Sequence, residues 1–148
     1  MRILIQHVKE ASVKVGEETV GKIEKGLLVF LGVHRDDTVE DCLWLKEKLL
    51  NLRIFPDSNG KMNLSVLDIQ GELLIVSQFT LYADCIHGRR PSFDQSASAE
   101  MAEKLYARFV EELRDSVKKV QTGRFVAYMQ VQLVNDGPLT FWVDSKER

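Results

Sequence analysis

The hydrophobic and polar positions along the chain follow two periods, and the shorter one predicts β-strands. Strands are expected where every second residue is apolar, or where nearly every residue in a short stretch is apolar. Clusters of glycine, proline and asparagine separate several of these stretches and predict tight turns. The expected strands cover residues 2–9, 12–15, 19–23, 27–33, 53–55, 72–77, 125–134 and 139–143.

The longer period predicts two helices. Apolar residues recur three or four positions apart within residues 38–51, and again within residues 98–116. Asp37, followed by Glu40 three residues later, resembles a capping box at the start of the first helix. Because strands outnumber helices and tight turns join several of them, we expect an α+β fold. It should contain mostly antiparallel β-sheets with two helices packed on them, in β/β/α layers.

Composition and charge narrow the class of protein. The chain has 148 residues, 45% hydrophobic and 28% charged, and we expect residues 1–148 to form a single domain. A net charge of -2 excludes a protein that wraps duplex nucleic acid, so no DNA partner is expected, although one end of a nucleic acid remains compatible. The first apolar run is too short for a signal peptide or a membrane span. We therefore expect a cytoplasmic protein with no membrane partner.

The familiar catalytic and metal-binding motifs are missing from the sequence. It contains no glycine-rich phosphate loop, no zinc-type histidine motif and no paired cysteines, so neither a metal nor a cofactor is expected. The histidines lie in separate elements. His7 is expected to be a hydrogen-bonded strand residue, and His34 a solvated loop residue. Cys42 falls on the apolar side of the first helix and is expected to be a core thiol.

Three polar segments carry candidate chemistry, each with a plainer structural alternative. Ser77-Gln78-Phe79-Thr80-Leu81 follows a buried strand, where a hydroxyl group either acts as a nucleophile or satisfies backbone groups at the strand end. Asn135-Asp136-Gly137-Pro138 reads as a turn, with a cis Gly-Pro bond as the alternative. Gly88-Arg89-Arg90-Pro91 is either a phosphate contact or an exposed loop. These segments alone indicate only an α+β domain that is a candidate hydrolase.

Four segments match motifs that occur together in one enzyme family. The similarity runs from Met1 to about Asp144, and the combination of Ser-Gln-Phe-Thr-Leu with Asn-x-Gly-Pro-x-Thr is highly specific. The segments are Asn51-Leu52-Arg53-Ile54-Phe55, Ser77-Gln78-Phe79-Thr80-Leu81, Gly88-Arg89-Arg90-Pro91-Ser92-Phe93 and Asn135-Asp136-Gly137-Pro138-Leu139-Thr140. In these segments the chain resembles the D-aminoacyl-tRNA deacylase family.

The resemblance implies a cytoplasmic homodimer with two active sites at the subunit interface. Members of the family hydrolyse the ester that joins a D-amino acid to the terminal adenosine of tRNA, and they also accept glycine. The 3′ end of aminoacyl-tRNA is therefore the expected partner, and the implied role is chiral proofreading in translation. A cis Gly137-Pro138 pair is implied to reach into the pocket of the other subunit, where its carbonyl oxygens collide with an L side chain. Rejection by collision lets one enzyme serve many side chains.

The resemblance also assigns catalytic and adenosine-binding residues. The backbone N–H groups of Phe79 and Thr80 are implied to point at the scissile carbonyl and stabilise the oxyanion. Ser77 and Gln78 are implied to hold the adenosine. An aminoacyl ester is already activated, and the neighbouring 2′-hydroxyl can help to activate water, so a catalytic triad is not required. A covalent role for the Thr80 hydroxyl stays open as an alternative.

The remaining site residues include departures from the family pattern. Ala102 and Met129 match positions that line the pocket around the amino group. His7 stands where the family has an arginine that braces the Gly-Pro segment, and an imidazole is shorter and only partly charged near neutral pH. Val126 and Tyr128 replace a glycine and an aspartate at the pocket rim. The bracing of the Gly-Pro segment and the shape of the rim are therefore open questions.

Two other functions remain as alternatives. A relative fused to archaeal threonyl-tRNA synthetase removes L-serine from tRNA, which would make L-seryl-tRNA the best substrate. The free-standing chain and the intact Gly137-Pro138 pair weigh against it. The lack of an evident catalytic side chain also fits a module that binds an RNA end without hydrolysing it, and turnover above the spontaneous rate of ester loss would exclude such a module.

Overall fold

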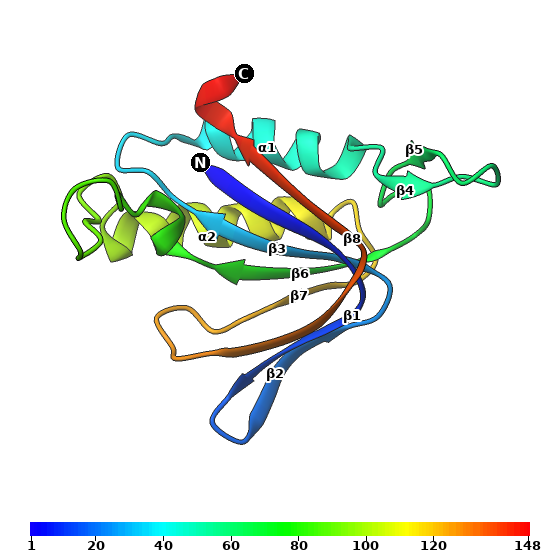
Figure 1. Cartoon of the computed structure of the whole chain (residues 1–148), viewed down its shortest axis with the longest axis horizontal. Coiled ribbons are helices and arrows are strands. Elements are labelled where there is room, and N and C mark those ends of the chain that lie inside the picture. Colours follow the sequence, from blue (N-terminus) through cyan, green and yellow to red (C-terminus); the bar gives the residue numbers. More distant parts are fainter.

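A long strand at the start of the chain organises the sheet (Figure 1). In the computed structural model, which describes all 148 residues, β1 (Arg2–Val15) is antiparallel to three other strands. Its first half pairs with β3 (Gly26–Gly32) and its second half with β2 (Glu18–Ile23). β8 (Gln130–Asp144) pairs with β1 along nearly its whole length. Both ends of the chain thus meet in one pair of strands.

The far side of β3 carries the parallel part of the sheet. β6 (Glu72–Ser77) is parallel to β3, and β7 (Val120–Thr122) is parallel to β6. Parallel neighbours need a long crossover connection, which α1 (Val39–Asn51) and α2 (Ala99–Arg114) provide. The remaining elements are short: β4 (Phe55–Pro56) and β5 (Met62–Leu64), which form a separate two-stranded sheet, and the 3-10 helices η1 (Phe79–Tyr82) and η2 (Ser145–Glu147).

Alternate residues of the central strands face two hydrophobic cores. Leu27 and Val29 of β3 lie in the larger core, together with Leu45 of α1 and Phe109 of α2. Both helices therefore cover the same face of the sheet. Leu28 points the other way, into a smaller core completed by β1, β2 and β6. Burial on both faces explains why β3 reads as a continuous apolar run rather than an alternating one.

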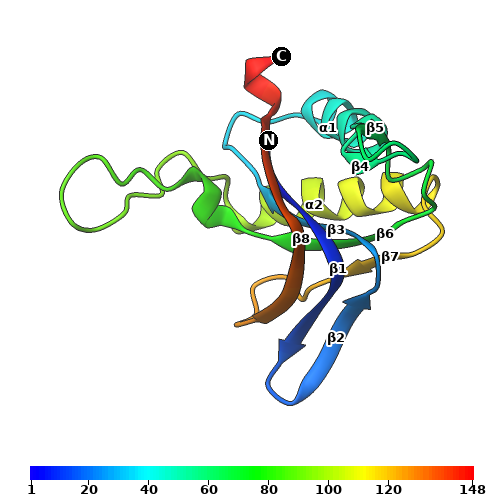
Figure 2. The same cartoon turned by 45° about the vertical axis from the view of Figure 1, so that its right-hand side comes forward.

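The sheet curls until its first strands approach its last ones, as the two views show (Figure 2). Gly21 of β2 lies so close to β7 that a Cβ atom there would stand 2.5 Å from the carbonyl oxygen of Thr122. The part of the sheet that contains β2 therefore lies over the part that contains β7, and the two helices cover the opposite face of this second part. The predicted α+β fold is confirmed, and its sheet is mixed, because the β3–β6 and β6–β7 pairs are parallel.

Several element boundaries differ from the predicted ones. The stretches 2–9 and 12–15 are a single strand, β1. Residues 125–129 are not in a strand, whereas β8 continues through the segment that was expected to be a turn. β4 begins at Phe55 rather than at residue 53. The three residues of β7 were not predicted, because so short a stretch has no period of its own.

Charged groups gather where β1 begins and β8 ends. The amino group of Met1 lies 2.6 Å from Asp37 Oδ1 and donates to Ser145 Oγ at 2.6 Å, fully buried. Lys146 Nζ lies 3.0 Å from Asp41 Oδ2. Burial favours a higher pKa for Asp41, but hydrogen bonds from Lys146 and from the backbone outweigh it and hold the pKa well below its usual range. We call these five residues the terminal charge cluster.

Two predictions about single residues have opposite outcomes. Cys42 is buried in the larger core, as predicted, and burial raises the pKa of its thiol to about 11. The prediction of a solvated His34 was wrong. Its side chain is only 19% exposed, its ring packs on Tyr82 with centroids 5.2 Å apart, and its backbone forms a bridge to Ser96.

None of the helices has the length and the apolar composition needed to cross a membrane.

Candidate active site

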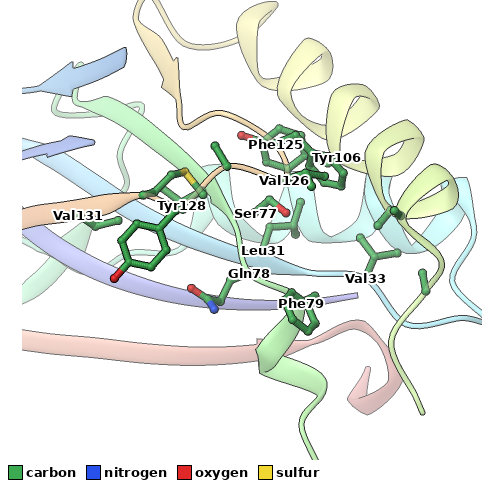
Figure 3. Close-up of a pocket in the computed structure, with 16 residues that line it drawn as sticks. Leu31, Val33, Ser77, Gln78, Phe79, Tyr106, Phe125, Val126, Tyr128 and Val131 are labelled. Carbon is green, nitrogen blue, oxygen red and sulfur yellow. The ribbon is translucent and has the colours of Figure 1, made fainter. Parts of the chain in front are cut away.

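A largely apolar pocket opens between the end of β6, the first half of α2 and the segment that joins β7 to β8 (Figure 3). Its volume is about 550 Å³, which lies in the range of sites for small molecules. Apart from Ser77, Gln78 and two tyrosines, every lining side chain is apolar, and no carboxylate, histidine, lysine or arginine lines it. Any chemistry in the pocket therefore depends on hydroxyl, amide and main-chain groups.

The polar end of the pocket forms where β6 passes directly into η1. The Gln78 amide N–H donates to the Leu31 carbonyl at 2.8 Å, so the pairing with β3 continues up to the start of η1. The Gln78 side-chain amide donates to the Thr80 hydroxyl. That amide is the only side-chain partner of the Thr80 hydroxyl, and an amide cannot accept its proton as a general base would.

Phe79 lies at the mouth of the pocket, where its side chain is 55% exposed. Its ring meets the ring of Phe93 edge to face, with centroids 4.9 Å apart. Its carbonyl oxygen accepts a hydrogen bond from Ser96 Oγ at 3.2 Å. The start of η1 is therefore held by the segment that leads into α2.

One carbonyl group ties three walls of the pocket together. The Ile75 carbonyl oxygen accepts hydrogen bonds from Tyr106 Oη at 2.8 Å and from the backbone N–H of Gly123 at 3.0 Å. It thus joins β6 to α2 and to the segment after β7. Burial raises the pKa of Tyr106 above its ordinary value, so the phenol stays protonated and donates. Tyr106 was not among the predicted site residues, although it lies one helical turn after Ala102 on the same face.

The segment between β7 and β8 forms the opposite wall and the rim. A Cβ atom at Gly123 would stand 2.6 Å from Met129 Sδ, so the glycine makes room for the Met129 side chain. Val126 adopts a φ of 60°, which a β-branched residue rarely does. This is the position where the family pattern has glycine, which adopts such a φ without strain. Val126 and Tyr128 are 82% and 90% exposed, so both replacements enlarge the apolar rim.

The Gly137-Pro138 pair lies outside the pocket of its own chain and is exposed to solvent. The three residues from Gln6 to Val8 in β1 face the six residues from Asn135 to Thr140 in β8, so the additional residues bulge out of the ladder. The peptide bond between Gly137 and Pro138 is cis. The expectation of a plain turn was wrong: the segment is a bulge inside a continuous strand.

The side chain of Asn135 closes the base of this bulge. Its Oδ1 accepts from the Leu139 backbone N–H at 2.8 Å, and its Nδ2 lies 3.3 Å from the Leu139 carbonyl and 3.2 Å from Thr140 Oγ1. Gln6 Nε2 donates to the same Thr140 hydroxyl at 3.3 Å. Neutral hydrogen bonds therefore hold both ends of the bulge, and sequence reasoning gave Asn135 and Thr140 no such role.

His7 lies beneath the bulge and is only 3% exposed. Its ring packs on Phe55 with centroids 4.3 Å apart, and its Nδ1 lies 3.8 Å from Asp136 Oδ2. Neither ring nitrogen has a hydrogen-bond partner, so the expectation of a hydrogen-bonded histidine was wrong. Burial lowers the pKa of His7 below its ordinary value, and the nearby Asp136 only partly opposes this. The ring is therefore mainly neutral at pH 7, and it packs on Phe55 rather than forming a hydrogen bond to the bulge.

The structure gathers most of the predicted site residues in one place. Thr80 is adjacent to the pocket, at its polar end, and the Gly137-Pro138 pair lies elsewhere on the chain. The predicted residues that line the pocket are Ser77, Gln78, Phe79, Ala102 and Met129.

Comparisons with known proteins identify the family. Residues 4–144 match the family model described as D-Tyr-tRNA(Tyr) deacylase. Two curated relatives are both named D-aminoacyl-tRNA deacylase. The one from Thermosipho africanus is 62% identical and the one from Thermotoga petrophila is 58% identical, each over 99% of both chains. The chain therefore belongs to the D-Tyr-tRNA(Tyr) deacylase family, as its motifs predicted. It is an enzyme, a hydrolase of the D-aminoacyl-tRNA deacylase class.

Two solved structures share the fold. One is a c-Myc DNA Unwinding Element Binding Protein, which is 41% identical and superimposes with a TM-score of 0.91. The other is a probable eukaryotic D-amino acid tRNA deacylase, with a TM-score of 0.82 and 20% identity. Each comparison covers 97% of this chain and 98% of the other. At 20% identity the second likeness supports the fold alone.

Proposed function

We propose that this chain hydrolyses the ester between a D-amino acid, or glycine, and the terminal adenosine of tRNA, and that it rejects L-aminoacyl-tRNA. It acts in the cytoplasm as a single catalytic domain that proofreads chirality in translation. The observation that carries the proposal is the uncharged pocket, whose polar groups are concentrated at the junction of β6 and η1. An activated ester needs orientation and oxyanion stabilisation more than a strong base.

The ester lies across the polar end of the pocket. Ser77 and Gln78 hold the adenosine, and the amino group of the substrate lies toward Ala102 and Met129. Support comes from the common pocket that these four side chains line. The apolar lining keeps bulk water from competing with the hydrogen bonds that orient the ester.

The chemical step is attack by water on the ester carbonyl carbon. The 2′-hydroxyl of the adenosine orients the water, accepts a proton from it and passes its own proton to the ribose oxygen that leaves, while the backbone N–H groups of Phe79 and Thr80 stabilise the oxyanion. The bond from the carbonyl carbon to the ribose oxygen then breaks, and that oxygen takes up a proton. The products are a free amino acid and an adenosine with both hydroxyls restored. The Thr80 hydroxyl is not the nucleophile, because its partner is the Gln78 amide rather than a base.

Chirality is read by the Gly137-Pro138 pair of a second copy of the chain. The pair is exposed and lies outside its own pocket, which supports action on a neighbouring subunit. Its main-chain oxygens approach the alpha carbon, the one centre that all substrates share. An L side chain collides with them, whereas a D side chain points away and glycine has none. The enzyme is therefore a homodimer with its active sites at the interface.

The test is single-turnover deacylation of four charged tRNAs, carrying D-tyrosine, L-tyrosine, glycine and L-serine. We expect rapid release of D-tyrosine and glycine, with the two L-amino acids released at the spontaneous rate. Equal release of D- and L-tyrosine would contradict the chirality filter. L-serine as the best substrate would favour the alternative deacylase, and no release above the spontaneous rate would favour a binding module.

The homodimer has a separate test in sedimentation velocity at the protein concentration of the assay. We expect a single species with the mass of two chains. A monomer that retains full selectivity for D-tyrosine would contradict the assignment of Gly137-Pro138 to the partner subunit.

A further inference from the structure

We infer that the loop between η1 and α2 is a second contact for the substrate, in which Arg89 and Arg90 bind phosphates of the single-stranded 3′ end of tRNA. The inference deepens the proposed function and rests on it, because it takes the ester in the pocket to be carried by tRNA. It assigns a binding surface to a segment outside the pocket.

The loop is built to project. Asp84 and Ser92 form an isolated antiparallel bridge, with reciprocal backbone hydrogen bonds of 2.8 and 2.9 Å, which closes the loop at its base. Figure 2 shows the segment between η1 and α2 extending away from the sheet and both helices. Gly88 at its tip adopts a φ of 75°, in the left-handed region that favours glycine. The residues beyond the bridge are thus presented to solvent.

The two arginines of the loop, Arg89 and Arg90, form no ion pair within the chain. Asp84 is already engaged, because its carboxylate accepts from the Ile86 backbone N–H at 2.8 Å and lies 3.3 Å from His87 Nδ1. Arg89 and Arg90 are exposed. The arginines that do form ion pairs in this molecule are Arg2, Arg35, Arg108 and Arg124. Two unpaired guanidinium groups on a chain of net charge -2 form a local positive site for a phosphate backbone.

The loop is continuous with the pocket. Phe93 follows the Asp84–Ser92 bridge directly, and its ring contacts Phe79 at the pocket mouth. Both rings are partly exposed, and exposed aromatic faces beside cations are typical of surfaces that bind single-stranded nucleic acid. A strand that leaves the pocket with its terminal adenosine inside would pass Phe79 and Phe93 before it reaches the arginines. RNA fits this order of contacts better than an acidic protein, which has no base to stack.

The experiment separates RNA binding from ester hydrolysis. Fluorescence anisotropy measures binding of uncharged tRNA, intact or lacking its single-stranded 3′ nucleotides, to the wild-type chain and to the double variant Arg89→Ala/Arg90→Ala. We expect the double variant to bind intact tRNA roughly tenfold more weakly and to lose about 0.7 per arginine from the slope of log affinity against log salt. It should bind the truncated tRNA as the wild type does.

The matched control removes two exposed lysines from the β1–β2 hairpin, Lys14→Ala/Lys22→Ala, and should leave binding unchanged. Equal affinity of wild type and loop variant for intact tRNA would overturn the inference. An equal loss with both tRNAs would also overturn it, because the arginines would then not contact the 3′ end. Hydrolysis of D-tyrosyl-adenosine by the wild type tests the proposed function alone, and its failure would leave the anisotropy result to decide on the loop.

Discussion

The terminal charge cluster and the pocket differ in the kind of polar groups they contain: charged groups in contact in the cluster, and neutral groups only in the pocket. In the cluster, the buried Met1 amino group contacts the buried Asp37, and the half-exposed Lys146 contacts the buried Asp41, whose pKa is held far below its ordinary value. In the pocket, no acidic or basic side chain lines the surface at all. Strongly shifted pKa values often mark active sites, yet here the carboxylate with the strongly lowered pKa lies at the joint between the two ends of the chain. In the pocket, the raised pKa of Tyr106 only keeps its phenol protonated.

The difference illustrates that an active site needs acidic or basic side chains with shifted pKa values only when its reaction needs a strong acid or base. The ester proposed for this pocket is activated before it arrives, so neutral groups in fixed positions are enough. The ion pairs of this chain's terminal charge cluster lie instead where β1 begins and β8 ends, and they hold these two ends together. Mutations in the two regions should therefore affect different properties: stability in the cluster, and activity or selectivity around the pocket.

The largest effect is expected from Asp37→Asn. The change leaves the buried Met1 amino group without its ion-pair partner, and breaking a buried pair costs about 3–5 kcal/mol of unfolding free energy. Urea denaturation measures the loss, and the activity of the remaining folded protein should not change. The control is the exposed neighbour, Asp36→Asn, with an expected change below about 0.5 kcal/mol. A large loss of activity without loss of stability would blur the distinction between the two regions.

The next largest effect is expected from Gly137→Ala. A Cβ atom there would stand 2.6 Å from Leu139 Cγ, at a φ of 138° that a side chain disfavours, so the bulge must shift. In the proposed dimer a displaced bulge no longer fits beside the alpha carbon of the substrate, so kcat/KM for D-tyrosyl-tRNA should fall by about a hundredfold, as misplacement of about 1 Å can do. Gly16→Ala, in an open turn of the β1–β2 hairpin, is the matched control. Equal kinetics in both variants would remove the bulge from the active site.

A smaller effect is expected from Thr80→Ala. The hydroxyl accepts the Gln78 side-chain amide, so its loss frees Gln78 and reduces activity less than about tenfold. Single-turnover deacylation measures the change, with Thr80→Ser as the variant that restores the hydroxyl. Abolished activity in Thr80→Ala, with the fold intact and full rescue by serine, would establish a nucleophile and end the contrast between charged cluster and neutral pocket.

The smallest effect is the pH dependence of stability at His7. Burial lowers the pKa of His7 in the folded chain, so the unfolded chain binds the proton more readily and stability falls as pH decreases through 6.5. His7→Phe keeps the contact with Phe55 and cannot titrate, so it should lose less stability between pH 8 and pH 5. Thermal denaturation at both pH values measures this. A steeper loss in the variant would mean that the imidazolium ion is stabilised in the fold.

The central elements could be predicted because their signals are local. β3 and β6 read as continuous apolar runs, and α1 and α2 as helical periods. The path of β8 could not be predicted in this way. Asn135-Asp136-Gly137-Pro138 has the composition of a turn, but pairing with β1 on both sides keeps the strand in line and forces the additional residues into a bulge. Long-range pairing overrides local turn preference there.

The site was predictable in part, and for a different reason. Motif resemblance, rather than periodicity, selected Ser77, Gln78 and Met129, which the fold brings to one pocket. Tyr106 could have been predicted from helical spacing, because it follows Ala102 by one turn of α2. The burial of His7 could not, because the cover over its ring comes from Phe55, far along the chain.

The exposed bulge has a genetic consequence. In the proposed dimer, a defect at Gly137-Pro138 damages the neighbour's pocket, whereas a defect at Ser77 damages the chain's own. A mixed dimer with one defect on each chain would combine both defects in one pocket and leave the other pocket whole. Two inactive variants, mixed in equal amounts and allowed to exchange subunits, would then regain about a quarter of the wild-type sites. Inactive alleles of such an enzyme can rescue one another within a cell.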